Sequence, residues 1–246
     1  MQNSAEKQTD KNSTFSDLPS RQNLQQGITA ALPICLGYFP VGLALGVLAS
    51  QSGIPWWAVA MMSILVFAGS AQFICVAMLA SGATAWSIVL TTFFVNLRHA
   101  LMSSALAVPM KKINRGFLTL FAYGITDESF ALNMARFRSG DWDRWRALVV
   151  NQVSNGVWII STVAGTLVGQ FIPQGAFGIG YALPAMFICL LVFQLHGRIY
   201  ILTGLLAFCL SIGWYLLVPG DSYIIGASVS AATLGFFLKR YKRRKK

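Results

Sequence analysis

The chain has 246 residues, of which 55% are apolar and 11% are charged, and its mean hydropathy is +0.60. This composition is too apolar for a soluble domain of this length and indicates an integral membrane protein. The net charge of +11 does not indicate a nucleic-acid partner, because the basic residues flank apolar segments, as they do in the cytoplasmic loops of membrane proteins.

Apolar segments follow one another along most of the chain. They lack the strict alternation of barrel strands, so the sequence predicts an all-α, polytopic membrane bundle of about seven to eight transmembrane segments. We expect a disordered polar tail at 1–26, a transmembrane transporter domain at 27–238 and a basic tail at 239–246. The expected segments are 27–50, 55–80, 84–108, 116–135, 147–171, 181–195, 199–218 and 222–238.

The first two segments carry residues that can interrupt a helix. Pro33 and Pro40 each remove a backbone hydrogen bond and are candidate break points, although a bent helix is the simpler interpretation. In the second segment, Gly69 and Gln72 lie in the motif Phe-Ala-Gly-Ser-Ala-Gln-Phe at 67–73. This motif fits either helix packing, with Gln72 bonded to a neighbouring helix, or a break that lines a substrate site.

Polar residues form a stripe along the third segment. Asn96 and His99 fall on one helical face together with Thr92 and Ser103, and Arg98 lies about 100° away. Ionisable side chains are costly in lipid, so we expect the stripe to face the bundle interior and Arg98 to have an acid or carbonyl partner. His99 is interpreted either as a packed, hydrogen-bonded residue or as a proton carrier.

The fourth segment contains the motif Gly-Ile-Thr-Asp-Glu-Ser-Phe at 124–130, with the adjacent acids Asp127 and Glu128. An unpaired charge at the bilayer centre costs about 2.5–3.5 kcal/mol, so these acids should face protein or water. Basic loops at 109–115 and 136–146 flank the segment, although short basic loops prefer the cytoplasm. Segment 116–135 therefore either crosses the membrane or is re-entrant or broken.

The remaining segments add packing faces, one polar residue and a topological signal. Gly42 and Gly46 in the first segment, and Gly165 and Gly169 in the fifth, are spaced for close helix contact. Asn155 in the fifth segment extends the set of polar groups within the apolar segments. The basic tail predicts a cytoplasmic C-terminus facing anionic lipid.

The sequence lacks the motifs of ATP-binding, dinucleotide-binding and metalloprotease sites, so we expect no cofactor and no metal. An intramembrane serine hydrolase would need Ser70 as its nucleophile and His99 or His196 as its base, and this is the weaker alternative. The sequence favours a transporter, not an enzyme.

Ionisable and amide groups spread over several segments are typical of a path for a polar or zwitterionic solute. The candidate path residues are Gln72, Asn96, Arg98, His99, Asp127, Glu128 and Asn155. In one interpretation, Arg98 binds a solute carboxylate while Asp127 or Glu128 binds its ammonium group. In the other, Arg98 only pairs with one of these acids.

Three motifs, at 67–73, 96–101 (Asn-Leu-Arg-His-Ala-Leu) and 124–130, resemble in order and spacing the AzlC family of branched-chain amino-acid permeases. Members of this family are multi-pass proteins of the inner membrane that export leucine, isoleucine, valine and related amino acids. They commonly act with a small four-helix partner of the AzlD type. The resemblance implies a branched-chain amino-acid exporter, for which we expect coupling to protons; the alternative is a permease or channel subunit for another small metabolite.

Overall fold

The computed structural model describes residues 20–110, 113–173 and 198–217, together with a few single residues and short pieces between 178 and 237. The regular elements in the three long ranges are all helices. The chain divides into two units, Met1–Gly180 and Tyr181–Lys246, which are described separately. Several expected parts of the chain lie outside the described residues. They are residues 1–19 of the expected tail 1–26, most of segments 181–195 and 222–238, and the basic tail 239–246.

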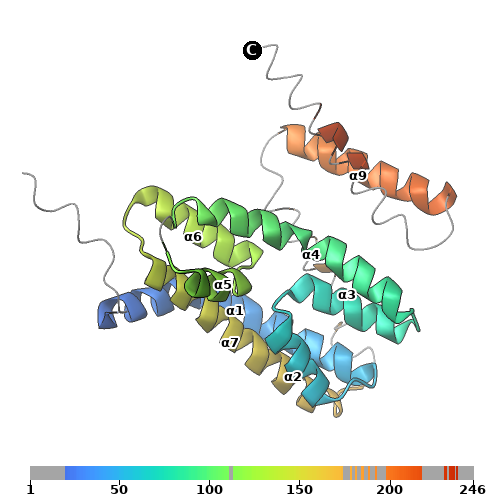
Figure 1. Cartoon of the computed structure of the whole chain (residues 1–246). Coiled ribbons are helices and arrows are strands. Elements are labelled where there is room, and N and C mark those ends of the chain that lie inside the picture. Colours follow the sequence, from blue (N-terminus) through green and yellow to red (C-terminus); the bar gives the residue numbers. More distant parts are fainter. Residues whose placement is uncertain are drawn as a thin grey trace, which may run out of the picture. The chain divides into compact units, whose positions relative to one another are not determined.

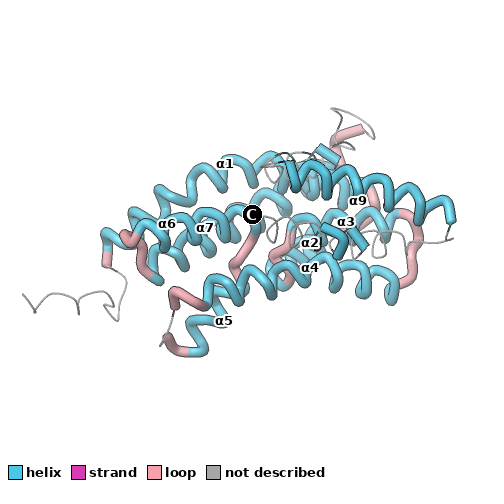
Figure 2. The backbone as a smooth tube through the Cα atoms, turned by 90° about the horizontal axis from the view of Figure 1, so that it is seen from above, coloured by secondary structure: helices cyan, strands magenta, loops and turns pink. Residues whose placement is uncertain are grey.

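Two long helices, α1 (Arg21–Gln51) and α7 (Arg144–Gly169), pack along each other in the first unit (Figures 1 and 2). They are the 2 helices of the described part that are long and apolar enough to cross a membrane. The glycine faces predicted on these two helices meet. A Cβ atom on Gly46 would lie 2.1 Å from the Thr162 carbonyl oxygen, and one on Gly165 would lie 2.2 Å from that of Leu43. The two backbones are therefore in direct contact, as small residues allow.

Helix α1 differs from its expected form in two ways. It begins at Arg21, where the Ser20 hydroxyl accepts a hydrogen bond from the Asn23 backbone N–H at 3.1 Å, so residues 21–26 are helical and not part of a disordered tail. It also continues through Pro33 and Pro40, so neither proline breaks it. The long contact with α7 outweighs the loss of one hydrogen bond per proline.

The expected second segment is interrupted. Helix α2 (Trp56–Leu65) ends before a non-helical stretch at 66–68, and α3 (Gly69–Ala80) begins at the glycine that we considered as a break point. A turn with Gly82 at a φ of 73° then leads into α4 (Ala85–Ala107), which packs against α3. Helices of this length reach roughly 15–18 Å, so neither α2 nor α3 alone spans a hydrocarbon core of about 30 Å.

The expected fourth segment is also interrupted. Helix α5 (Arg115–Tyr123) ends before a non-helical stretch at 124–126, and α6 (Asp127–Ser139) follows. Thr126 and Ser129 form a reciprocal capping box that starts α6, and Gly140, at a φ of 86°, ends it. The structure therefore confirms that segment 116–135 is broken, and whether it crosses the membrane stays a prediction.

In the second unit, α9 (Arg198–Leu217) is an apolar helix that coincides with the expected segment 199–218. The described residues thus confirm an all-helical fold, consistent with a helical membrane protein, and the count of seven to eight segments stays a prediction.

Candidate functional site

The two helix interruptions meet in the first unit. The Tyr123 hydroxyl, at the end of α5, donates a hydrogen bond to the carbonyl of Ile64 at the end of α2. The start of α3 and the start of α6 are joined through Arg98 of α4. The Arg98 guanidinium donates to the Ser70 hydroxyl and forms an ion pair with Asp127, with 2.7 Å between Nη1 and Oδ2. One cation thus contacts the first turns of both helices.

Tyr38 of α1 forms a second bridge between the interruptions. Its hydroxyl lies 2.6 Å from Glu128 Oε2 and 2.7 Å from Thr126 Oγ1. Its ring makes edge contacts with Phe67, in the α2–α3 interruption, and with Trp158 of α7, at centroid distances of 6.2 and 5.4 Å. Phe67 and Trp158 are 5% and 2% exposed, so an aromatic wall closes one side of the site.

Two side chains of α7 donate to carbonyl groups at the end of α5, next to the interruption at 124–126. The Asn151 amide donates to the Phe121 carbonyl at 3.0 Å and accepts from Asn133 at 3.1 Å. The Gln152 amide donates to the Leu120 carbonyl at 3.2 Å. These contacts tie the end of α5 to α7, and the Phe121 carbonyl also accepts from the Gly124 backbone N–H at 3.2 Å.

Further along α7, the contacts go to the other interrupted segment. Trp158 Nε1 donates to Gln72 Oε1 at 2.7 Å, and Gln72 Nε2 donates to the Ser63 hydroxyl at 3.0 Å. The Ser63 hydroxyl lies 2.9 Å from that of Thr162. Both ends of the Gln72 amide are therefore used within the protein, which matches the packing interpretation of this residue.

Asn155 lies on α7 between these two sets of contacts, one turn from Asn151 and about one turn from Trp158. It is 4% exposed, and its Oδ1 atom has no hydrogen-bond partner among the described residues. On α4, three further atoms are buried and have no hydrogen-bond partner in the described part: Asn96 Oδ1, Arg98 Nε and His99 Nε2. Unpaired buried polar atoms cost about 1–3 kcal/mol each, so they are typical of a site that binds a polar solute or water.

The starts of α3 and α6 carry opposite electrostatic character. No described side chain caps α3, whose first turn is buried and presents the partial positive charge of its backbone N–H groups. Helix α6 begins with Asp127 and Glu128, and these two acids have different partners, Arg98 and Tyr38. The site therefore has a cationic side and an anionic side.

His99 and Ser70, two further residues singled out by the sequence, both lie near the interruptions. His99 lies next to the backbone of Ile125, in the middle of the α5–α6 interruption. Ser70 accepts a hydrogen bond from Arg98, a cation that cannot act as a base, so this geometry gives no support to a serine hydrolase. His196, the other candidate base, lies outside the described residues.

The sequence interpretation did not include Tyr38 and Trp158. Both belong to long apolar helices, where an aromatic residue is unremarkable. The sequence signal that could have indicated them is the polar atom in each side chain, the tyrosine hydroxyl and the indole N–H, because a buried tyrosine or tryptophan usually finds a hydrogen-bond partner.

The chain is similar in sequence to one family of membrane proteins. The family model described as AzlC protein matches residues 33–172, which is more than half of the chain. The inner membrane protein YgaZ of Escherichia coli (strain K12) is 29% identical over 181 residues, covering 71% of this chain and 74% of the relative. The branched-chain amino acid transport protein AzlC of Bacillus subtilis (strain 168) is 24% identical over 200 residues, covering 81% and 78%. No solved structure matches the chain. The chain belongs to the AzlC family of membrane proteins.

Proposed function

We propose that this protein exports small zwitterionic amino acids, with branched aliphatic side chains, across the cytoplasmic membrane. The observation that carries this proposal is the position of Arg98 between the first turns of α3 and α6. A solute carboxylate can take the place of Asp127 on the Arg98 guanidinium, aided by the N–H groups that start α3. The ammonium group can then bind the acids that start α6.

The side chain of the solute would meet the aromatic wall. Phe67 and Trp158 are buried beside Tyr38, so this part of the site is apolar next to a few directed polar groups, as small-molecule sites usually are. The name of the Bacillus subtilis relative adds support for a branched-chain substrate.

We infer coupling to protons from the ionisable groups gathered at the α5–α6 interruption. Asp127 and Glu128 start α6, and His99 lies next to the backbone of Ile125. Acids and histidines within the membrane region are the groups that carry protons in transporters. We also expect a small four-helix membrane partner of the AzlD type and a cytoplasmic C-terminus.

Counterflow of labelled leucine in proteoliposomes, with and without the small partner, tests the transport proposal. We expect saturable leucine flux with the wild-type chain and loss of this flux in Arg98→Gln. The matched control is Arg115→Gln, an exposed arginine at the start of α5. Absence of saturable leucine flux under every condition would overturn the proposal. Flux of another metabolite that leucine does not inhibit would assign the chain to a different substrate.

A further inference from the structure

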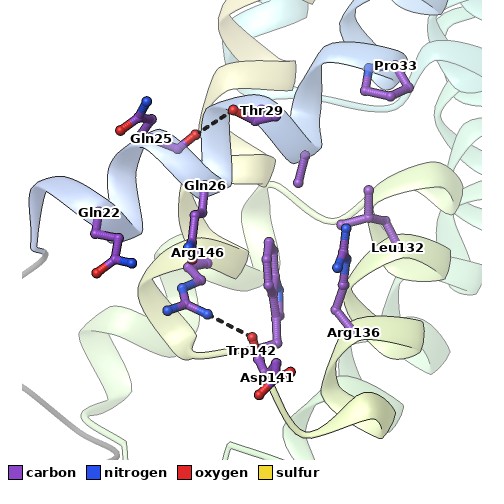
Figure 3. Close-up of a pocket in the computed structure, with 11 residues that line it drawn as sticks. Gln22, Gln25, Gln26, Thr29, Pro33, Leu132, Arg136, Asp141, Trp142 and Arg146 are labelled. Carbon is purple, nitrogen blue, oxygen red and sulfur yellow. Dashed lines mark hydrogen bonds between the residues drawn. The ribbon is translucent and has the colours of Figure 1, made fainter.

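A cavity of about 920 Å³ lies at one end of the first unit, apart from the interruptions. It is bounded by the first turns of α1, including Gln22 and Gln26, by Leu132 and Arg136 of α6, and by Trp142 in the loop before α7 (Figure 3). Its volume is in the range of cavities that hold small molecules.

Two arginines lie on either side of Trp142 in this cavity (Figure 3). The Arg146 guanidinium lies 6.0 Å from the ring and is fixed by Asn23 Oδ1 at 3.2 Å and by the Asp141 carbonyl at 2.7 Å. The Arg136 guanidinium lies 5.4 Å from the ring. Within the described residues, the Arg136 guanidinium contacts the Trp142 ring and forms no hydrogen bond or ion pair. A stacked guanidinium keeps its N–H edge available, and that edge fits a carboxylate.

Residues on the inner wall of the cavity lie between the cavity and the candidate site. Leu132 and Trp142 line the cavity and also pack against a buried apolar cluster that contains Ile34. Tyr38 packs against the same cluster and bonds Glu128 with its hydroxyl. On the surface of α6, Glu128, Leu132 and Arg136 follow at intervals of four residues, so they share one face over roughly 12 Å. A thin apolar layer therefore separates the cavity from the Tyr38–Glu128 pair.

We propose that this cavity is a vestibule that receives the zwitterionic amino acid before it reaches the candidate site, and that Arg136 binds its carboxylate there. Leu132 and Ile34 form the layer that must move for the solute to pass. The inference rests on the proposed function. The flanking segment 136–146, formed by the end of α6, a short turn and the start of α7, carries four arginines against two aspartates. This excess of positive charge predicts that the vestibule opens to the cytoplasm, the side from which an exporter takes its substrate.

The first test uses Leu132→Cys in a chain whose native cysteines are replaced by serine. A charged, impermeant methanethiosulfonate reagent should modify Cys at this position from the side of loop 136–146 and block leucine flux. Saturating leucine should slow the modification about 5-fold. The matched control is Ala131→Cys, which is exposed on a neighbouring face of α6, and its modification should leave flux unchanged. Absence of labelling of Leu132→Cys, or labelling without effect on flux, would overturn the proposal.

The second test compares Arg136→Gln with Arg138→Gln, an exposed arginine that does not line the cavity. We expect Arg136→Gln to raise the KM for leucine on the loop side about 10-fold with little change in kcat, and Arg138→Gln to leave both values unchanged. Both variants are measured in vesicles of phosphatidylcholine alone and in vesicles that also contain phosphatidylglycerol.

The same two vesicle types are used for the labelling of Leu132→Cys. If phosphatidylglycerol protects this cysteine from the reagent in the absence of leucine, the cavity binds a lipid headgroup and the vestibule proposal is wrong.

The wild-type flux separates the two proposals. If the wild-type chain transports leucine while Arg136→Gln keeps the wild-type KM, the vestibule proposal is wrong and the proposed function is unaffected. If the wild-type chain transports no amino acid, both the proposed function and the vestibule proposal are wrong.

Discussion

The two interruptions, at 66–68 and 124–126, differ in how their free backbone groups are used. At 124–126, the capping box serves the start of α6, and Asn151 and Gln152 bind carbonyls at the end of α5. At 66–68, the end of α2 is bound by Tyr123, but no described side chain caps the start of α3. At the α5–α6 interruption, side chains of the capping box and of α7 bind the backbone, whereas the start of α3 keeps its N–H donors available.

This difference indicates a division of roles. The start of α6 supplies negative charge through two acids, and the start of α3 supplies backbone donors beside Arg98. A zwitterion presents an ammonium group and a carboxylate, which are complementary to these two helix starts.

The largest expected effect comes from removing the cation that both interruptions share. In Arg98→Gln, the solute carboxylate and Asp127 both lose their charged partner, and we expect kcat/KM for leucine to fall on the order of 100-fold. Counterflow in proteoliposomes measures this change. A fall of less than 3-fold would show that Arg98 does not bind the solute.

The packing of the two interruptions can be compared by adding one methyl group to each. A Cβ on Gly124 would lie 2.7 Å from Asn151 Cβ, whereas one on Gly69 would lie 3.0 Å from the edge of the Trp158 ring. We expect Gly124→Ala to destabilise the protein by about 2–3 kcal/mol and Gly69→Ala by about 1 kcal/mol. Thermal unfolding in detergent measures both. Gly156→Ala, where a Cβ would have no neighbour within 4 Å, is the control.

The two acids should differ in effect because they have different partners. Asp127→Asn removes the negative charge that pairs with Arg98, so we expect a loss of leucine transport close to that of Arg98→Gln. In Glu128→Gln, the amide oxygen can still accept from Tyr38, and we expect about a 10-fold loss. Initial rates of counterflow give the comparison. Equal, wild-type transport by both variants would show that the acids have only structural roles.

The smallest expected effect comes from giving α3 the cap that α6 already has. In Ala68→Ser, the hydroxyl would compete with the solute carboxylate for the first-turn N–H groups, so we expect KM to rise about 3-fold. The unfolding temperature should stay the same or rise. The reciprocal variant Thr126→Ala removes an existing cap and should cost about 1 kcal/mol of stability. An unchanged KM in Ala68→Ser would show that these N–H groups do not contact the solute.

The sequence predicted those features that depend on composition and short spacing. The apolar segments, the glycine faces of α1 and α7, and the acids that need a partner all follow from local patterns. Arg98 and Asp127 were both proposed as site residues because charges in lipid are costly, and pairing between them was one of two interpretations. The structure has this pair.

Contacts between distant parts of the chain could not be predicted in the same way. The hydrogen bond between Tyr38 and Glu128 joins residues 90 positions apart, and no periodicity indicates it. Prolines were a poor guide to interruptions, because the packing of α1 against α7 keeps α1 continuous. The interruptions occur instead at glycine-containing motifs, where a neighbouring helix contacts the backbone closely.

The direct contact between α1 and α7 limits which parts of this protein can move. Because Gly46 and Gly165 each touch a backbone carbonyl of the other helix, sliding one helix along the other would push larger side chains into those oxygens. The pair should therefore move as one rigid body. Any movement that carries a solute across the membrane must then occur between this pair and the other helices.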